Sequence, residues 1–306
     1  MLYDCRIYSI DENYHAIIKD TVTEIGPGFF SFTEVVGNVV SVDIPSTVTA
    51  IKDEAFWHLR SLKTIFIPEG VIEIGEKAFD HCISLMSIEV DERNPRYCSM
   101  GGMLFDKKEH ILFGCPRCMQ GECIIPDGVT KLEPNTFFDV PGLTRVVIPQ
   151  SVSEVSWGAF SYCDSLVSID VDENNPYLCS VDGVLYNKKM DVLLRFPEGK
   201  QAGEYRIPDG VTCINEFSFF NARKLAHVEI PDSVSMIGEK AFCYCDKLDL
   251  IKIPDSVKSI DYEAFLKVKH IEYHGSAKWY RCNFTAVDWF SDYDSDDKYW
   301  GALRMN

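Results

Sequence analysis

Apolar residues recur along this chain at fixed distances from a repeated Ile-Pro dipeptide. Counting from each such Ile, an apolar residue falls at +4 and +7, an Ala-Phe pair at +11 and +12, Leu at +18, and Ile or Val at +21. The dipeptide recurs at intervals of 23, 58, 23, 59, 23 and 23 residues, starting from Ile44, Ile67, Ile125, Ile148, Ile207, Ile230 and Ile253. About eight units of this kind tile residues 18–274, and a period of this length indicates a solenoid.

Each unit predicts two elements. The stretch Leu-x-x-Ile-x-Ile alternates inward and outward side chains with a period of two, which is typical of a short strand. The Pro that follows lacks an N–H group and ends the strand. The Gly-x-x-Ala-Phe segment is expected to form a short helical turn on the opposite, convex side. Because one unit cannot bury its own apolar face, stacked units should share a continuous core, so the chain is predicted to be an α/β solenoid.

The two long intervals are copies of each other at an offset of 81 residues. Residues 91–122 and 172–204 form these inserts. In the second insert Asp182-Gly183 lies between short apolar runs, which is a two-residue hairpin signal. Each insert is therefore predicted to be a β-hairpin or small β-meander that grows out of the solenoid.

The chain is expected to be one solenoid domain over residues 1–306. Residues 1–17 would form an N-terminal cap, 18–274 the repeats, and 275–306 a C-terminal cap or tail. This last segment holds three of the five Trp residues, at Trp279, Trp289 and Trp300. It could cover the last core or act as an acidic aromatic hook for a partner, while a calcium loop is disfavoured because Asp297 and Leu303 stand where Gly and Glu are needed.

Charge and composition exclude several classes. The formal net charge is -17 and the pI about 4.8, so a phosphate-binding surface is disfavoured and no nucleic-acid partner is expected. No apolar stretch approaches the roughly 18 residues of a membrane span, and the start of the chain lacks the pattern of a secretory signal. With reduced cysteines, the sequence as given is expected to be soluble and cytoplasmic.

Three cysteines at +15, Cys82, Cys163 and Cys245, are predicted to be small apolar fillers, because sister units hold Leu, Val or Ala at this position. Cys115, Cys118 and Cys123 form a better zinc or redox candidate, since two thiolates two residues apart can bind one tetrahedral ion. A second Cys-x-x-Cys is missing, and the sister insert has Phe196-Pro197-Glu198-Gly199 there. We therefore assign no metal and no cofactor, and leave a disulfide or metal at this loop open.

No catalytic motif accompanies the repeat. The chain has no Gly-x-Ser-x-Gly elbow, Walker loop or metalloprotease His pair in a suitable context, and its carboxylates are spread over repeated turns. The sequence predicts that the protein is not an enzyme.

The repeat Leu-x-x-Ile-x-Ile-Pro-x-x-Val-x-x-Ile-Gly-x-x-Ala-Phe-x-x-Cys-x-x-Leu, with its Asn-Pro…Ser-x-Asp-Gly-Val-Leu-Tyr inserts, resembles the BspA-type leucine-rich repeat family. The resemblance covers roughly residues 18–280. It implies a curved solenoid with a parallel sheet on its concave face and a bacterial or protist origin. Family members are described as adhesins and interaction proteins, so it also implies binding rather than catalysis, and it permits a secreted or cell-surface location.

If the Ile positions at -2 and 0 point inward, the residues at -1 and -3 point outward and form a ladder that a partner could contact. In the central units Ile124 and Val147 should form an apolar strip with Arg145 beside it, which suits a protein hot spot. The candidate partner-binding residues are Phe66, Glu89, Ile124, Arg145, Val147, Asp170, Arg206, His227, Glu229 and Lys252.

Three binding functions remain open from the sequence. The first is protein recognition through the concave sheet and the inserted hairpins. The second is a cell-surface adhesin for a glycan or a host protein, although Phe66 is the only aromatic residue of the ladder before the last coil. The third is an acidic mimic of nucleic acid that sequesters a basic protein.

Overall fold

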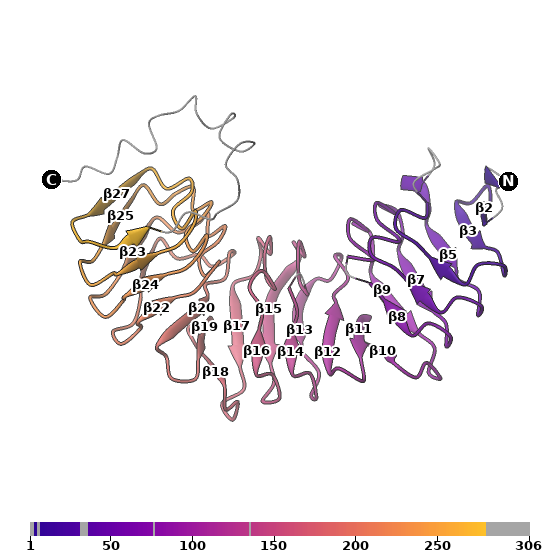
Figure 1. The fold of residues 1–306 in the computed structure, drawn as a ribbon, viewed down its shortest axis with the longest axis horizontal. Coiled ribbons are helices and arrows are strands. Elements are labelled where there is room, and N and C mark those ends of the chain that lie inside the picture. Colours follow the sequence, from indigo (N-terminus) through magenta and orange to yellow (C-terminus); the bar gives the residue numbers. More distant parts are fainter. Residues whose placement is uncertain (1–2, 5–6, 31–35, 76, 135, 280–306) are drawn as a thin grey trace. The chain divides into compact units, whose positions relative to one another are not determined.

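The computed structural model describes residues 3–4, 7–30, 36–75, 77–134 and 136–279, and it shows a β-solenoid of about 11 turns (Figure 1). The chain divides into two compact units. Unit 1 runs up to Gln120 and includes Gly128–Gly142, and unit 2 comprises Gly121–Asp127 and the residues from Leu143 onward. Each unit has its own cluster of buried apolar side chains. The single domain expected from the sequence stays a prediction.

The main strand of each repeat ends beside the Ile-Pro dipeptide, or at the matching position of repeats that lack it, and we call these strands the face strands. In unit 1 they are β3 (His15–Ile18), β5 (Ser41–Asp43), β7 (Thr64–Ile67) and β9 (Ser87–Val90). In unit 2 they are β13 (Gly121–Ile124), β15 (Leu143–Ile148), β17 (Ser168–Val171), β21 (Glu204–Arg206), β23 (His227–Glu229), β25 (Leu250–Ile253) and β27 (His270–Tyr273). Pairs such as β7 with β9 and β25 with β27 are parallel and keep the repeat in register. The strands predicted from the period of two are confirmed, and so is the parallel pairing that the family resemblance implies.

A second, two-residue strand follows in most turns, at positions +6 and +7. These short strands are β4 (Glu24–Ile25), β6 (Ala50–Ile51), β8 (Glu73–Ile74) and β14 (Lys131–Leu132) in unit 1, and β16 (Glu154–Val155), β22 (Cys213–Ile214), β24 (Met236–Ile237), β26 (Ser259–Ile260) and β28 (Lys278–Trp279) in unit 2. They pair in parallel, with Ile51 opposite Ile74 and Ile214 opposite Ile237. The repeat predicts that the apolar residue at +7 lies in the core, but it predicts no strand at this position, because two residues are too few to show an alternation of inward and outward side chains.

The Phe residues of the Ala-Phe pairs form a file through each core. In unit 1 the rings of Phe56 and Phe79 stack at 5.6 Å between centroids. In unit 2 Phe242 lies between Phe219, at 4.8 Å, and Phe265, at 5.4 Å, with nearly parallel planes. This alignment confirms the shared apolar core predicted from the repeat.

The helical turns predicted around the Ala-Phe pairs are wrong. Within the described residues the one helical segment is a 3-10 turn, η1 (Val36–Asn38), so the chain is all-β rather than α/β. The reason is local: a left-handed residue precedes the Ala-Phe pair and another follows two residues after the Phe, as with Glu54 (φ 57°) and His58 (φ 67°). A helix cannot continue through such residues.

The backbone of these turns is instead bonded to the next turn of the solenoid. The N–H of Phe56 donates to the carbonyl of Ala78 at 2.9 Å, and the N–H of Phe219 donates to that of Ala241 at 2.7 Å. These bonds take the place of the i to i−4 bonds of a helix.

The inserts are three-stranded antiparallel meanders, as predicted. The strands are β10 (Tyr97–Met100), β11 (Met103–Asp106) and β12 (Ile111–Gly114) in unit 1, and β18 (Leu178–Val181), β19 (Val184–Asn187) and β20 (Val192–Arg195) in unit 2. The predicted Asp182-Gly183 hairpin turn is confirmed, with both residues at positive φ. The inserts do not grow out of the solenoid, however, because β20 pairs in parallel with β22 and Phe196 stacks on Phe219 at 5.1 Å. Each insert is a turn of the stack.

A buried Asn anchors each insert to the turn before it. In unit 2 the Asn175 amide donates to the carbonyls of Pro149 and Val152 at 2.8 and 2.9 Å, and its oxygen accepts from the N–H groups of Tyr177 and Leu178. Asn94 makes the matching bonds in unit 1. The Asn-Pro pair of the insert motif is thus explained by four satisfied hydrogen bonds.

At the N-terminal end, β1 (Tyr3–Asp4) and β2 (Tyr8–Ile10) add antiparallel strands to β3. Tyr8 is buried and lies 4.7 Å from Phe30 between ring centroids. At the other end Trp279 is the last described residue, 6.2 Å from Phe265. Nearly all of the predicted C-terminal cap, the acidic aromatic hook and the calcium alternative lie outside the described residues.

Candidate functional site

The predicted partner-binding residues all lie on face strands, and their side chains are exposed or half-buried. The inward neighbours, such as Ile65 and Val146, are buried. We call the outward residues at -1 and -3 of the face strands the ladder face. The register of the ladder is as predicted, with Phe66 opposite Glu89 in unit 1, and Ile124 opposite Val147 and Arg206 opposite Glu229 in unit 2. Partner binding at the ladder face stays a prediction.

The most exposed apolar residue of the ladder face is Ile124 on β13. Its side chain is 65% exposed, whereas a β-branched residue in a strand is usually at least half covered. Val147 on β15 lies opposite Ile124 and is half-buried. Asp170 on β17 lies opposite Val147 and ends the apolar strip on that side.

The Arg145 guanidinium beside this strip is held by two carboxylates. Its Nε donates to Asp170 at 2.6 Å, and another nitrogen of the same group pairs with Glu122. The three side chains come from three neighbouring face strands, β13, β15 and β17. The cation predicted to lie beside the apolar strip is there, but it is already paired within the face.

The other cations of the ladder face are paired in the same way. Lys252 lies 3.0 Å from Glu272 and Arg206 lies 3.7 Å from Glu229, each across neighbouring face strands. In unit 1 the ladder also has polar contacts, since the ring nitrogens of His15 are hydrogen-bonded to Ser41 at 2.6 Å and to Asp43 at 2.9 Å. Since opposite charges face each other directly, the register of the strands is supported by the ladder itself.

The tip of each insert hairpin reaches the neighbouring face strand. The carbonyl of Gly102 accepts from the N–H of Ile88 on β9 at 2.8 Å, and the carbonyl of Gly183 accepts from that of Ile169 on β17 at 2.9 Å. A Cβ atom on Gly183 would lie 2.9 Å from the Cα of Ser168, so glycine is required for this approach. The inserted hairpins therefore adjoin the ladder face.

The cysteines at +15 are buried fillers, as predicted. The thiol of Cys82 donates to the carbonyl of Phe56 at 3.2 Å, and that of Cys245 to the carbonyl of Phe219 at 3.1 Å. Burial raises the pKa of Cys82 to about 12, which keeps it in the thiol form.

Cys115 and Cys118 belong to unit 1 and Cys123 to unit 2, and none of the three is in a disulfide among the described residues. The thiol of Cys118 donates to the carbonyl of Ile83 at 3.2 Å, and Cys123 is buried on β13 with a pKa raised by burial to about 12. Among the described residues no group of three His, Cys, Asp or Glu side chains is arranged to hold a metal ion.

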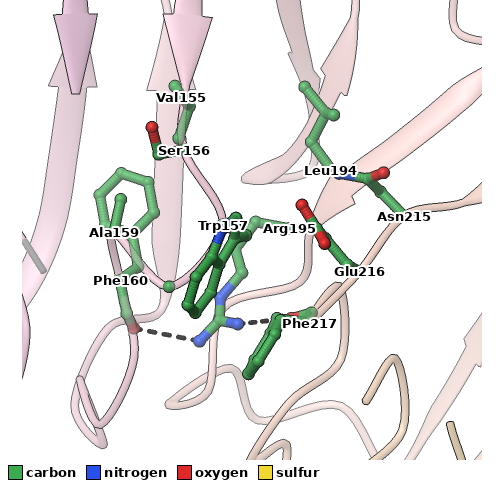
Figure 2. A pocket seen from close by; sticks show the side chains of 11 residues that line it. Val155, Ser156, Trp157, Ala159, Phe160, Leu194, Arg195, Asn215, Glu216 and Phe217 are labelled. Carbon is green, nitrogen blue, oxygen red and sulfur yellow. Dashed lines mark hydrogen bonds between the residues drawn. The ribbon is translucent and has the colours of Figure 1, made fainter. Parts of the chain in front are cut away.

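A buried ionic cluster in the second insert was missed by the sequence analysis. Arg195, at the end of β20, and Glu198 are 4% and 3% exposed and pair with each other. The guanidinium also donates to the carbonyls of Phe160, at 3.0 Å, and Phe217, at 2.5 Å (Figure 2). The Asn221 amide donates to the second Glu198 oxygen at 2.5 Å. The sequence held one signal for this cluster, since Arg195 and Glu198 replace Gly114 and Arg117 of the sister insert.

The Glu198 carboxyl is a strongly perturbed acid. Burial raises its pKa to about 7, although Arg195, Asn221 and the Tyr162 N–H each lower it. Arg195, which pairs with Glu198, is hydrogen-bonded to the turns around Phe160 and Phe217. The cluster therefore joins segments of unit 2 that are distant in sequence.

The chain belongs to the BspA-type leucine-rich repeat family. A family model described as a BspA-type leucine-rich repeat region matches six copies over residues 8–94, 114–180 and 196–283. Proteins of this repeat family generally bind proteins or are surface-associated, and they are generally non-catalytic. No curated protein matches the chain.

Solved structures show the same fold. A leucine-rich repeat protein from Eubacterium ventriosum is 21% identical, with a TM-score of 0.62 over 89% of this chain and 70% of that one. The pneumococcal vaccine antigen PcpA is also 21% identical, with a TM-score of 0.52 over 84% of this chain and 64% of that one. At this identity the similarity establishes the fold alone.

No helix among the described residues is long and apolar enough to span a membrane.

Proposed function

We propose that this protein is a non-catalytic recognition module that binds a protein partner through the ladder face of unit 2, centred on Ile124 and Val147, together with the tip of the inserted hairpin of the same unit, at Gly183. The observation that carries the proposal is the 65% exposure of Ile124 in a face whose cations are paired with carboxylates. An apolar side chain in the centre of such a face gains free energy when a partner covers it.

The pairing of Arg145 supports the same choice. A guanidinium already bonded to Glu122 and Asp170 offers little to a free anionic ligand, but it forms a pre-ordered polar rim beside the apolar strip. Pre-ordered rims lower the entropy cost of association. The hairpin tip at Gly183 supports the proposal further, because it is fixed against β17 next to the same strip.

The experiment is affinity capture of partners from a native extract by the full chain and by two variants, followed by titration of the purified partner. Ile124→Asp changes the strip, and Met236→Asp is the matched control, because Met236 is 42% exposed on the short strand β24, away from the ladder face. We expect Ile124→Asp to lower the affinity of the partner at least tenfold and Met236→Asp to leave it unchanged. Equal binding by both variants would contradict the proposal.

Two outcomes would favour the other binding functions. Binding to a glycan array that survives Ile124→Asp would favour a glycan adhesin. Capture of basic proteins that is lost with added salt, regardless of Ile124, would favour an acidic mimic, since screening weakens long-range attraction between exposed charges.

A further inference from the structure

The two inserts provide an internal comparison, because they are copies of each other built on the same strand pairs. In unit 2 Leu185 lies opposite Arg195, and in unit 1 Leu104 lies opposite Gly114. The next N–H donates to the following turn in both copies, from Phe196 to Ser218 and from Cys115 to Thr136. Gly114 therefore occupies the position of Arg195.

The Arg195 side chain fills this place in unit 2. Its guanidinium lies between the turns of Phe160 and Phe217 (Figure 2), and the remaining cavity, lined also by Trp157 and Glu216, has a volume of only about 20 Å³. The protein thus places a guanidinium group here as a structural element.

In unit 1 the described residues around the matching place line a pocket of about 350 Å³. This volume is within the range of small-ligand sites. Phe79, Cys115 and Phe138 line it, and a Cβ atom added to Gly114 would meet nothing within 4 Å. The pocket is therefore the space that a side chain such as that of Arg195 would occupy.

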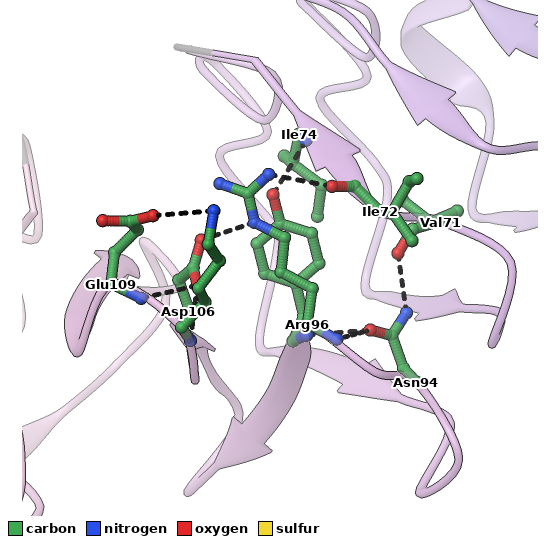
Figure 3. A network of polar contacts seen from close by, with 9 residues as sticks. Val71, Ile72, Ile74, Asn94, Arg96, Asp106 and Glu109 are labelled. Atoms are coloured by element: carbon green, nitrogen blue, oxygen red, sulfur yellow. Dashed lines mark hydrogen bonds and ion pairs between the residues drawn. The ribbon is translucent and has the colours of Figure 1, made fainter.

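The carboxylates that line the pocket are Asp80, Asp106, Glu109 and Glu133, and the lining cations are Lys77, Arg96 and Arg117. Three of these carboxylates are in ion pairs: Asp106 with Arg96, Glu109 with Lys108 at 3.4 Å, and Glu133 with Lys131 at 3.4 Å. Asp80 is the lining carboxylate that has no ion pair among the described residues. The Arg96 guanidinium pairs with the Asp106 carboxylate at 2.8 Å and also donates to the carbonyl of Ile72 (Figure 3). The Arg117 guanidinium donates to the backbone carbonyl of Asp139 at 3.0 Å and pairs with the carboxylate of the same residue.

Asp80 is the carboxylate best placed for an incoming cation. It follows Phe79, as Ser161 follows Phe160 in unit 2, and the carbonyl of Phe160 accepts from Arg195. A group in the same place in unit 1 would have the Phe79 carbonyl and the Asp80 carboxylate as acceptors. Burial raises the pKa of Asp80, although His81, Lys77 and Arg117 each lower it.

We propose that this unit 1 pocket binds the guanidinium group of an arginine side chain presented by a partner polypeptide. The partner would supply in trans the group that Arg195 supplies in cis in unit 2. A planar guanidinium fits because it can donate to a carbonyl and a carboxylate together, which a lysine ammonium matches less well. The site is separate from the ladder face, so the two proposals can fail independently.

The test is calorimetric titration of the full chain with three capped tripeptides: Gly-Arg-Gly, the same peptide with citrulline, which has a similar shape but no charge, and Gly-Lys-Gly. We expect saturable one-to-one binding of the arginine peptide, with the citrulline peptide at least tenfold weaker and the lysine peptide weaker than arginine. Equal binding of arginine and citrulline peptides, or no saturation with the arginine peptide, would overturn the proposal.

Three variants locate the site. Gly114→Arg should abolish binding without lowering the melting temperature, because the new side chain fills the pocket as Arg195 does. Asp80→Ser, which installs the unit 2 residue, should weaken binding at least tenfold, and this variant decides the question if Gly114→Arg does not fold. Ser161→Ala, at the equivalent position of the filled copy, is the control and should bind normally. Undiminished binding by Gly114→Arg or Asp80→Ser would overturn the assignment, and binding of free arginine without binding of the peptide would rule out the polypeptide partner.

Discussion

Single aromatic rings hold successive turns of the solenoid together. Phe242 is fully buried and has a ring on each side, Phe219 and Phe265. Phe242→Ala should lower the free energy of unfolding by about 3 to 5 kcal/mol, because it removes buried area and leaves a cavity. Chemical denaturation measures this. Phe66→Ala is the control, since Phe66 is 50% exposed, and its effect should stay within about 0.5 kcal/mol. Similar losses for both variants would mean that the file of rings is not the core.

At the same scale, Glu198 makes stability depend on pH. Its pKa is raised to about 7 in the folded chain from the ordinary value of 4.5 for a glutamate, so the folded state holds an extra proton between these values. Stability then falls as the pH rises through this window and levels off above it. Glu198→Gln removes this contribution, so the wild-type stability should decline relative to the variant between pH 5 and 7, by up to about 1.4 kcal/mol per pH unit. Parallel stability curves from urea unfolding at several pH values would contradict a raised pKa.

At the scale of elements, the face strands and the insert hairpins were predictable, whereas the two-residue strands and the Ala-Phe turns were not. A period of two shows in Thr64–Ile67, because alternate side chains meet water and core, and the hairpin at Asp182-Gly183 has its own turn chemistry. The Ala-Phe turns carried no such signal. Most of their left-handed residues, such as His58 and Tyr162, are not glycine, although Gly158 is. The backbone hydrogen bonds to the next turn also depend on residues that are distant in sequence, so no local pattern reports them.

The Asn anchors of the inserts give a prediction at this scale. Asn175→Ala would leave two buried carbonyls and two N–H groups without their partner, at a cost of about 1 to 3 kcal/mol for a buried polar group left unsatisfied. Unfolding midpoints in denaturant measure the loss. Asn174→Ala is the neighbouring control, because Asn174 is exposed and bonds only within its own turn to Asp172. Equal midpoints for the two variants would show that the anchor contributes little.

At the scale of the whole molecule, the sequence predicts which residues lie on the ladder face but not how their side chains interact. The alternation of inward and outward residues is enough to predict that Ile124 and Arg145 point outward. The pairing of Arg145 with Glu122 and Asp170 could not be, because side-chain ion pairs depend on rotamers. The unit 1 pocket could not be predicted from the sequence either. The sequence shows Gly114 in the position of Arg195, but only the three-dimensional structures of both inserts show that the missing side chain leaves a pocket.

Each turn of a solenoid contacts mainly its neighbours, so a local substitution should destabilise the nearby turns and leave distant turns unchanged. Hydrogen exchange of Asn175→Ala should accelerate in β18–β20 and the turns next to them, while amides of β5 and β7 in unit 1 keep their protection. Asn94→Ala should give the reciprocal result, with acceleration around β10–β12 and protection kept in β24 and β25. Exchange measured by mass spectrometry on peptides from both units decides this. If either substitution raised exchange equally everywhere, opening would be one global event, and the additive picture of turns supporting their neighbours would be wrong for this chain.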